Sequence, residues 1–432
     1  MRKIVVGGTV TLLVAVGWFC QAGRVSAENR ARDTSSYLTF AREQMELGAY
    51  GSAIANIKKA ISVNETLEDR LLLADAYQAG GYIETYKTYM EDLIKAYPQE
   101  REPYWRLAKY YYDTGGYARS CEILLPALQQ GIATAEMVDL YYQCAYKYTI
   151  VGVDYDNIHN CYQNIMVTEK DGNYSFLDSR LNYIVKAEYE SASPFYSSIA
   201  AVKADGHTFF MDQKGRKYLD TVQPYERIYS FSDNLAAVVK EGQYYYVDSH
   251  YREVRGPYED ALNFASGASF VKVDGLWYLM DSSGKILEDL NFEEIVFDEE
   301  RQATNQSRFF AKEQGFYYLY DTAGKRLSET GFEDAKPFYT DGFAAVKTEG
   351  LWGFVGLDGT IVIEPQYEDA NSFGNKVAAV SVEGKWGFIN LQNRMVIEPE
   401  FEDAKCMGTN RMAPVMMDGC WRILKLTAAV SQ

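Results

Sequence analysis

The sequence has few of the residues that usually build catalytic or metal sites. Its 432 residues include only three histidines, His159, His207 and His250, and no metal-ligand spacing joins them. It has no phosphate loop, dinucleotide fingerprint or Gly-x-Ser-x-Gly nucleophile turn. The acidic stretch at residues 154–157 lacks the glycine and distal glutamate of a calcium loop. We therefore expect no catalytic, cofactor-binding or metal-binding residues, and an enzyme is disfavoured.

Cysteine is also scarce, and its spacing suggests neither a zinc site nor a disulfide framework. There are six cysteines and no Cys-x-x-Cys pair: Cys20, Cys121, Cys144, Cys161, Cys406 and Cys420. Cys406 and Cys420 are close enough in sequence to pair. Two small, packed, reduced residues are the favoured interpretation.

Basic residues are outnumbered. Lys and Arg total 43 against 60 Asp and Glu, which gives a formal charge of −17. Phosphate backbones and anionic lipid headgroups repel such a surface, so nucleic acid is excluded as a partner. The charge favours basic or neutral partners.

One long apolar run is present, at the N-terminus. Arg2 and Lys3 precede the uncharged stretch 4–19, and Val25-Ser26-Ala27 offers a site for signal peptidase. Residues 1–27 therefore read as an export signal, either cleaved or retained as a membrane anchor. The bulky residues before Cys20 argue against lipid attachment. We expect an exported protein, secreted or anchored, that contacts the membrane only through this segment.

Residues 35–150 show a helical hairpin pattern with a fixed period. The small residues Ala41, Ala74 and Ala108 lie 33 and 34 apart, and so do three turn glycines, Gly48, Gly81 and Gly115. A period in this range is typical of stacked helix pairs. We expect three such pairs and a further helix from about residue 134 to 148.

These units resemble tetratricopeptide repeats, with Gly-x-Tyr turns, small packing residues and, in the second unit, a closing Pro98. The first unit departs from the pattern, since Glu65 stands where the proline belongs. The resemblance implies a concave face that binds a partner protein. The candidate partner-binding residues are Tyr77, Tyr110, Tyr111, Tyr141 and Tyr142, although aromatic residues at helical spacing are more often core.

Residues 165–425 carry a second repeat. Asp-Gly or Glu-Gly turns followed by an aromatic strand recur about every 35 residues, with one longer interval around 299–306. Turns of this kind between short alternating strands indicate β-hairpins. The markers of the repeat are Gly172, Gly206, Gly242, Gly275, Gly315, Gly350, Gly384, Trp277, Trp352, Trp386 and Trp421.

Two sets of carboxylates recur in phase with this repeat, and we interpret both as turn-stabilising acceptors rather than as acids or bases. One set follows an aromatic residue: Glu190, Glu226, Glu259, Glu293, Glu333, Glu368 and Glu402. The other opens hairpin turns: Asp178, Asp212, Asp248, Asp281 and Asp321.

The second array resembles the WG-repeat family, through Trp352-Gly353, Trp386-Gly387 and the Ile-Glu-Pro triplets that begin at Ile363 and Ile397. The match is close over 349–416 and degenerate over 171–348. It implies a repeat-built binding module and names no ligand.

The expected fold class is therefore α + β multidomain: a tetratricopeptide-like helical solenoid, then an all-β array of about seven 35-residue meanders. A β-propeller, with its last strand completing the first blade, is favoured; an open β-solenoid is the alternative.

We interpret the protein as a non-enzymatic scaffold outside the cytoplasm that binds protein partners through both arrays. The alternative is a cell-envelope carbohydrate-binding protein, which exposed aromatic residues clustered on one rim would support. An enzyme would require two non-repeating carboxylates meeting in a cleft.

Overall fold

The computed structural model describes residues 34–185, 189–196, 198–218 and 225–427. The chain forms two compact units, divided between Ala145 and Tyr146. No helix in these described ranges is long and apolar enough to cross a membrane. The predicted export signal or anchor, residues 1–27, lies outside the described residues.

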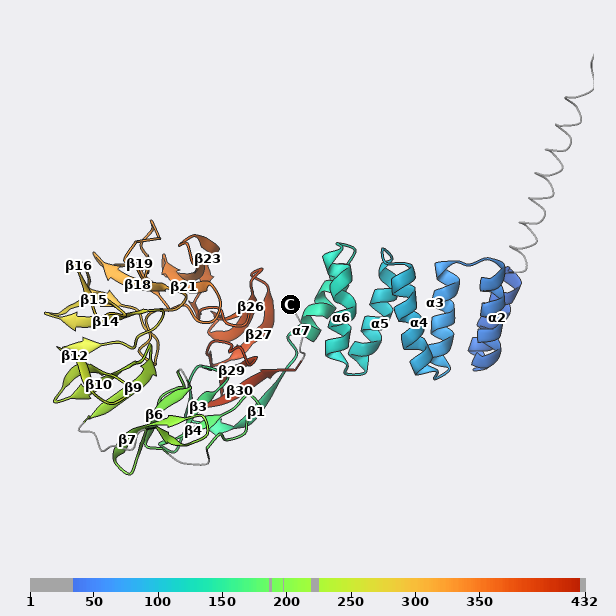
Figure 1. The fold of residues 1–432 in the computed structure, drawn as a ribbon. Helices are drawn as coiled ribbons and strands as arrows, with labels where there is room; N and C mark the ends of the chain where they lie inside the picture. The colour runs from blue at the N-terminus through green and yellow to red at the C-terminus, as the bar shows by residue number, and fades with distance from the viewer. Residues whose placement is uncertain (1–33, 186–188, 197, 219–224, 428–432) are drawn as a thin grey trace, which may run out of the picture. The chain divides into compact units, whose positions relative to one another are not determined.

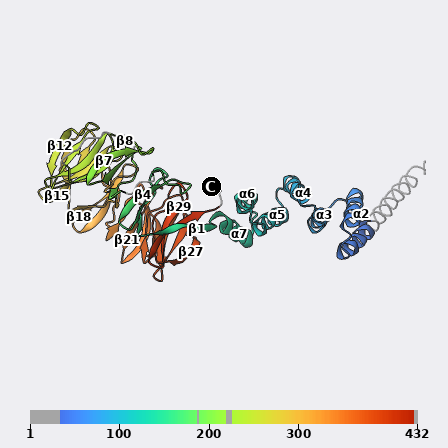
Figure 2. The same ribbon diagram turned by 90° about the horizontal axis from the view of Figure 1, so that it is seen from below.

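The first unit is a series of antiparallel helices that follow one another in chain order (Figures 1 and 2). Residues 34–46 are helical, and the helices after them are α2 (Tyr50–Val63), α3 (Leu67–Ala79), α4 (Ile83–Ala96), α5 (Arg101–Asp113), α6 (Tyr117–Gln129) and α7 (Ala135–Ala145). Gly48, Gly81 and Gly115 have φ of 72°, 78° and 81°, in the left-handed region that glycine adopts without strain. Ala41 and Ala108 are fully buried, so the small residues allow close helix packing, as predicted.

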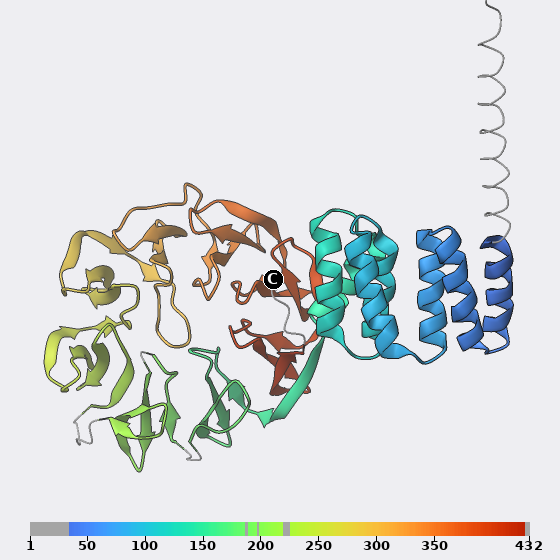
Figure 3. The ribbon, with the colours of Figure 1, turned by 45° about the vertical axis from the view of Figure 1, so that its right-hand side comes forward.

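The second unit is an eight-bladed β-propeller (Figure 3). Its first four blades consist of β2 (Asn157–Ile158), β3 (Met166–Lys170) and β4 (Asn173–Leu177); β5 (Ser191–Ala192), β6 (Ile199–Ala204), β7 (His207–Asp212) and β8 (Lys217–Tyr218); β9 (Arg227–Ser232), β10 (Leu235–Lys240), β11 (Gln243–Val247) and β12 (Glu253–Tyr258); and β13 (Asp260–Ala261), β14 (Ala268–Val273), β15 (Leu276–Asp281) and β16 (Ile286–Phe292).

The remaining blades complete the ring. They consist of β17 (Glu294–Ile295), β18 (Arg308–Glu313) and β19 (Phe316–Asp321); β20 (Asp334–Ala335), β21 (Phe343–Thr348), β22 (Leu351–Gly356) and β23 (Ile361–Tyr367); β24 (Asp369–Ala370), β25 (Val377–Val382), β26 (Lys385–Asn390) and β27 (Met395–Phe401); and β28 (Asp403–Ala404), β29 (Met412–Met417), β30 (Cys420–Leu426) and β1 (Tyr148–Tyr155). The propeller is therefore confirmed.

Two details of the predicted ring were wrong. The ring has eight sheets rather than about seven, and the last strand does not complete the first blade. Instead β1, which precedes the predicted array, pairs antiparallel with β30 and forms the outer strand of the eighth blade. The physical reason is that β30 would expose an unpaired outer edge without β1, and β1 covers this edge. β1 carries no Asp-Gly or Glu-Gly turn, so the repeat pattern could not include it.

The repeated glutamates hold the hairpin turns, as predicted. Each of the seven accepts a hydrogen bond from a backbone N–H of the next turn, as Glu368 does from Gly384 N at 2.7 Å. The predicted role of the repeated aspartates is also confirmed. In each, Oδ1 accepts the N–H groups two and four residues ahead, as Asp212 does from Lys214 and Arg216, both at 2.9 Å.

The described cysteines are free thiols, so Cys406 and Cys420 form no disulfide. Four are buried, and Cys420 alone among the described cysteines is partly exposed. We therefore expect a maleimide to label Cys420 well before Cys121, Cys144, Cys161 or Cys406 in the native protein, because a thiolate must reach the reagent. Mass spectrometry of timed digests would measure this order. Rapid native labelling of Cys161 or Cys406 would contradict the packing.

Candidate binding site in the central channel

One connection in the propeller differs from the others. The chain between β17 and β18 spans residues 296–307, whereas the same connection in the preceding blade spans only 262–267. This connection, here called the channel loop, runs into the space inside the ring (Figure 3). The long interval in the sequence repeat therefore corresponds to a segment inside the channel.

The channel loop repeats a turn that the blades use elsewhere. Asp298 Oδ1 accepts the backbone N–H groups of Glu300 and Gln302 at 3.0 and 2.9 Å, the pattern of Asp212 and its counterparts. Arg301 has φ of 60°, in the left-handed position that Gly215 occupies in the equivalent turn. The loop is thus a further copy of the Asp-led hairpin turn, placed in the channel.

Arg301 fastens one side of the loop to blades three and four. Its guanidinium donates to Asp260 and to the carbonyl of Ala261, and it lies 5.2 and 5.3 Å from the ring centroids of Tyr229 and Tyr244. Next to it, the backbone N–H of Asn263 donates to the Arg301 carbonyl at 3.0 Å, and the Asn263 side chain donates to Glu300 O at 2.8 Å.

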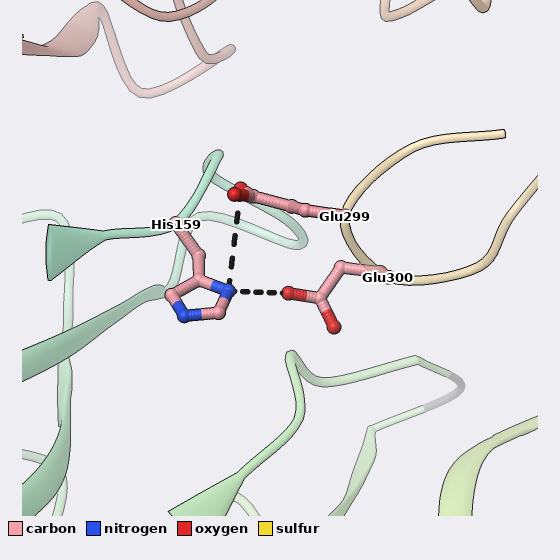
Figure 4. Close-up of side chains that lie close together, drawn as sticks. All are labelled: His159, Glu299 and Glu300. Atoms are coloured by element: carbon pink, nitrogen blue, oxygen red, sulfur yellow. Dashed lines mark hydrogen bonds and ion pairs between the residues drawn. The ribbon is translucent and has the colours of Figure 1, made fainter.

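Glu299 and Glu300 fasten the other side of the loop to blades one and eight. His159 Nδ1 lies 2.5 Å from Glu300 Oε1 and 4.0 Å from Glu299 Oε1 (Figure 4). Lys405 Nζ lies 2.8 Å from Glu299 Oε2, and the backbone N–H of Asn160 donates to Glu299 Oε1 at 2.9 Å. The loop therefore joins blades on opposite sides of the ring.

His159, Glu299 and Glu300 offer ligand atoms within 4.8 Å of one another, a grouping that could hold a metal ion. Burial alone would lower the pKa of His159, but the hydrogen bond and charge of Glu300 raise it above the ordinary value. Burial raises the pKa of Glu300, whereas Lys405 and His159 overcome burial and lower that of Glu299. Lys405 and His159 are therefore the partners of the two glutamates within the protein.

Asp298 has the most strongly shifted pKa in the channel loop. Burial raises its pKa to about 7, against the stabilising hydrogen bond that Tyr162 donates to it. Burial also raises the pKa of Tyr162 and of its neighbour Tyr196 well above the ordinary value. Tyr162 and Tyr196 rings stand 5.1 Å apart. Near neutral pH a large share of Asp298 is therefore protonated.

The channel loop borders two cavities. The larger, of about 610 Å³, includes Asp298, Glu299, Lys336, Trp386 and Lys405 in its wall. The smaller, of about 390 Å³, lies on the other side of the same loop, where Glu300 and His159 contribute to its wall. Both cavities belong to the propeller unit. We call the larger one the channel pocket.

Two carboxyl groups outside the predicted repeated sets, those of Asp298 and Glu299, both line the channel pocket, as an enzyme would require. Their pKa values are shifted apart, as in many acid–base pairs. However, both oxygens of each are engaged: Asp298 by two turn amides and Tyr162, Glu299 by Lys405 and Asn160. These contacts hold the channel loop in place.

The predicted repeat markers occupy structural positions. The turn glycines all have positive φ and open space beside them, and Trp277, Trp352, Trp386 and Trp421 are 5–9% exposed. The described tryptophans of the propeller therefore form no exposed aromatic rim of the kind that a carbohydrate-binding surface would need.

The predicted partner-binding tyrosines are divided between the core and the surface of the helical unit. Tyr77 and Tyr141 are buried, whereas Tyr110, Tyr111 and Tyr142 are half-buried. The rings of Tyr110 and Tyr111 are in contact at 5.7 Å, and those of Tyr141 and Tyr142 at 5.5 Å. The candidate set thus forms two contacting pairs plus the buried Tyr77.

Sequence reasoning missed the channel residues His159, Asp298, Glu299 and Lys405. The only available signal was the long interval between the turn glycines Gly275 and Gly315, which marked an insertion without showing where it goes.

The family model described as "WG containing repeat" matches residues 174–206, 225–244, 319–352, 352–386 and 386–421. The predicted WG repeats are thereby confirmed. No curated protein matches the sequence significantly.

Solved structures give only a distant likeness. Kluyveromyces lactis Hsv2 has 11% identity and a TM-score of 0.36, covering 64% of this chain and 97% of that chain. A structure titled as the eukaryotic initiation factor has 10% identity and a TM-score of 0.39, covering 60% and 82%. One titled as the mitotic checkpoint complex has 8% and 0.36, covering 65% and 96%. At these values the likenesses carry no functional argument.

Proposed function

We propose that the protein is a non-enzymatic scaffold outside the cytoplasm, which binds protein partners through its propeller and its tetratricopeptide-like helices. The observation that carries the proposal is the channel pocket, a cavity of ligand-binding size whose polar groups are fixed by the channel loop. The location rests on the signal-like residues 1–27 and their apolar stretch.

The state of the pocket carboxylates supports binding over catalysis. A general acid or base needs an oxygen within hydrogen-bond reach of the substrate. The oxygens of Asp298 and Glu299 are already engaged by the protein. The helical unit offers a second candidate surface, because the side chains of Tyr110 and Tyr111 are only half-buried.

A pull-down from envelope extract with the full-length chain tests the proposal. We expect specific protein partners to be retained. Tyr110→Ala should reduce the retained amount of at least one of them about tenfold, because it removes a partly buried aromatic contact residue. Tyr82→Ala, at a 49% exposed tyrosine outside the predicted set, is the matched control. Retention of polysaccharide without protein would contradict the scaffold and support the carbohydrate alternative.

A further inference from the structure

The propeller repeats one aromatic position, and most copies of it carry a cation. The position lies two residues after each turn glycine, and an aromatic residue occupies it in seven of the described blades: Tyr174, Tyr244, Trp277, Tyr317, Trp352, Trp386 and Trp421. Because the blades are repeats, each ring provides an internal comparison for the others.

Five of these rings have a lysine or arginine of the same protein over them. The distances from cation to ring centroid are 5.3 Å for Arg301 and Tyr244, 5.8 Å for Lys272 and Trp277, 5.2 Å for Lys312 and Tyr317, 5.0 Å for Lys336 and Trp352, and 5.1 Å for Lys405 and Trp421. These separations suit cation–π attraction. In the sixth, the Tyr174 ring contacts His159, whose pKa is raised.

Trp386 is the exception: no cation of the described part of the chain lies over its ring. The sequence explains why. Lys336 and Lys405 each follow an Asp-Ala pair, and Asn371 stands at that position in the Trp386 blade. Lys272 acts instead from the strand paired with its tryptophan, where Ser381 pairs with Trp386. Both positions that supply a lysine in other blades carry a neutral residue here.

The uncovered ring lies in the wall of the channel pocket, and the wall is acidic. It contains two lysines, the carboxylates of Glu299, Asp369, Glu402 and Asp403, and Asp298, of which a large share is protonated near neutral pH. Lys336 pairs with Asp369 at 3.1 Å and Lys405 with Glu299 at 2.8 Å. Asp403 pairs with no cation in the described ranges, and burial raises its pKa although Lys336 and Lys405 oppose the shift. An added cation would therefore be stabilised in this pocket.

We propose that the channel pocket binds a primary alkylammonium group over Trp386, presented by a lysine side chain of a protein partner. The pocket supplies a ring equivalent to those that Lys336 and Lys405 cover in neighbouring blades. Asp403 and the Asn371 amide oxygen, which already accepts from Lys336 Nζ at 3.2 Å and has a second lone pair, would accept the N–H groups of the ammonium. The charge of −17 on the whole chain favours a basic partner segment. The assignment of the amine to a protein partner rests on the proposed function.

Calorimetric titration of the full-length chain tests the inference. The probe is a short glycine peptide with one central lysine, and its control is the same peptide with that lysine acetylated on Nε. We expect the lysine peptide to bind at least about tenfold more tightly, because acetylation removes the charge. Equal affinities, or no binding of the lysine peptide, would overturn the inference.

Three variants locate the amine. Trp386→Leu removes the ring and Asn371→Lys supplies an internal cation, so each should weaken lysine-peptide binding about tenfold or more. Tyr317→Leu removes a lysine-covered ring in blade five. Neither Tyr317 nor its cation Lys312 lies in the pocket wall, so this variant should retain binding within about twofold. Unchanged binding in both Asn371→Lys and Trp386→Leu would overturn the site.

A second titration and the pull-down distinguish a protein partner from a small diamine as the source of the amine. Binding of 1,5-diaminopentane without binding of the lysine peptide would overturn the partner as the source. Captured protein partners that do not depend on Trp386, with no lysine-peptide binding, would overturn this inference and leave the proposed function standing. Lysine-peptide binding without any captured partner would overturn the proposed function and leave the amine site.

Discussion

Replacing Thr149 with proline is expected to lower the free energy of unfolding of the propeller by about 1–3 kcal/mol, the cost of a ladder hydrogen bond lost with its acceptor left unpaired. Thr149 lies in β1, opposite Lys425 of β30. The Thr427 backbone N–H donates to the Lys147 carbonyl at 2.7 Å, so the alternation of an antiparallel ladder makes Thr149 and Lys425 the next hydrogen-bonded pair. Proline cannot donate at that position, and it breaks the pairing that closes the ring.

Thr149→Ala is the matched control. The Thr149 side chain is exposed, so its removal leaves the backbone hydrogen bonds in place and should change stability by less than about 0.5 kcal/mol. Denaturant unfolding followed by tryptophan fluorescence measures both variants. Hydrogen exchange should show faster exchange in β1 and in β28–β30 of the proline variant. Equal stability of the two variants would mean that β1 does not close the ring.

This closure shows what the sequence could and could not predict. The turn motif recurs from blade to blade together with the carboxylate that accepts its backbone N–H groups. The hairpins and the roles of Glu368 and Asp212 could therefore be predicted from spacing. β1 has no such motif, and its place is decided by the free edge of β30 far along the chain. A local pattern cannot indicate a partner strand that lies so far away in sequence.

The channel site was hidden for a similar reason. Its groups come from separate blades: His159 from the first, Glu300 from the fifth and Lys405 from the eighth. The sequence marked the insertion but gave no sign that its Asp-led turn would lie inside the ring. The missing cation over Trp386 became visible only when each ring could be compared with the lysine above it.

The stability of the channel loop should depend on pH through Asp298. Burial raises the pKa of Asp298 to about 7 in the folded protein, above the usual value near 4. A raised pKa means that the folded state holds its proton more tightly than the unfolded state does. The resulting stabilisation is complete below about pH 4 and is lost as the pH rises through about 7. His159, whose pKa is also raised, acts in the same direction.

Asp298→Asn isolates this effect, and the protein itself provides the precedent. Asn390 occupies the equivalent turn of another blade and accepts the N–H groups of Gln392 and Arg394, both at 3.0 Å. The asparagine variant should therefore keep the turn but lose the titration. Between pH 4 and 8, we expect the wild type to lose on the order of 2–4 kcal/mol of stability relative to the variant.

Asp248→Asn is the control of opposite sign, because the hydrogen bond from Arg252 lowers the pKa of Asp248 to about 2 in the same kind of turn. Its carboxylate stabilises the fold above about pH 4, and that stabilisation is lost as the pH falls toward 2. The difference in the free energy of unfolding between wild type and Asp248→Asn should therefore stay constant from pH 5 to 8. Over the same range the difference between wild type and Asp298→Asn should change. Denaturant titrations at each pH measure both differences. A flat result for Asp298→Asn as well would show that the channel loop does not bury a protonated carboxyl group. If instead the stability of the wild type falls with rising pH while that of the Asp298→Asn variant does not, the loop between the two cavities is held most firmly in acid and released toward alkaline pH.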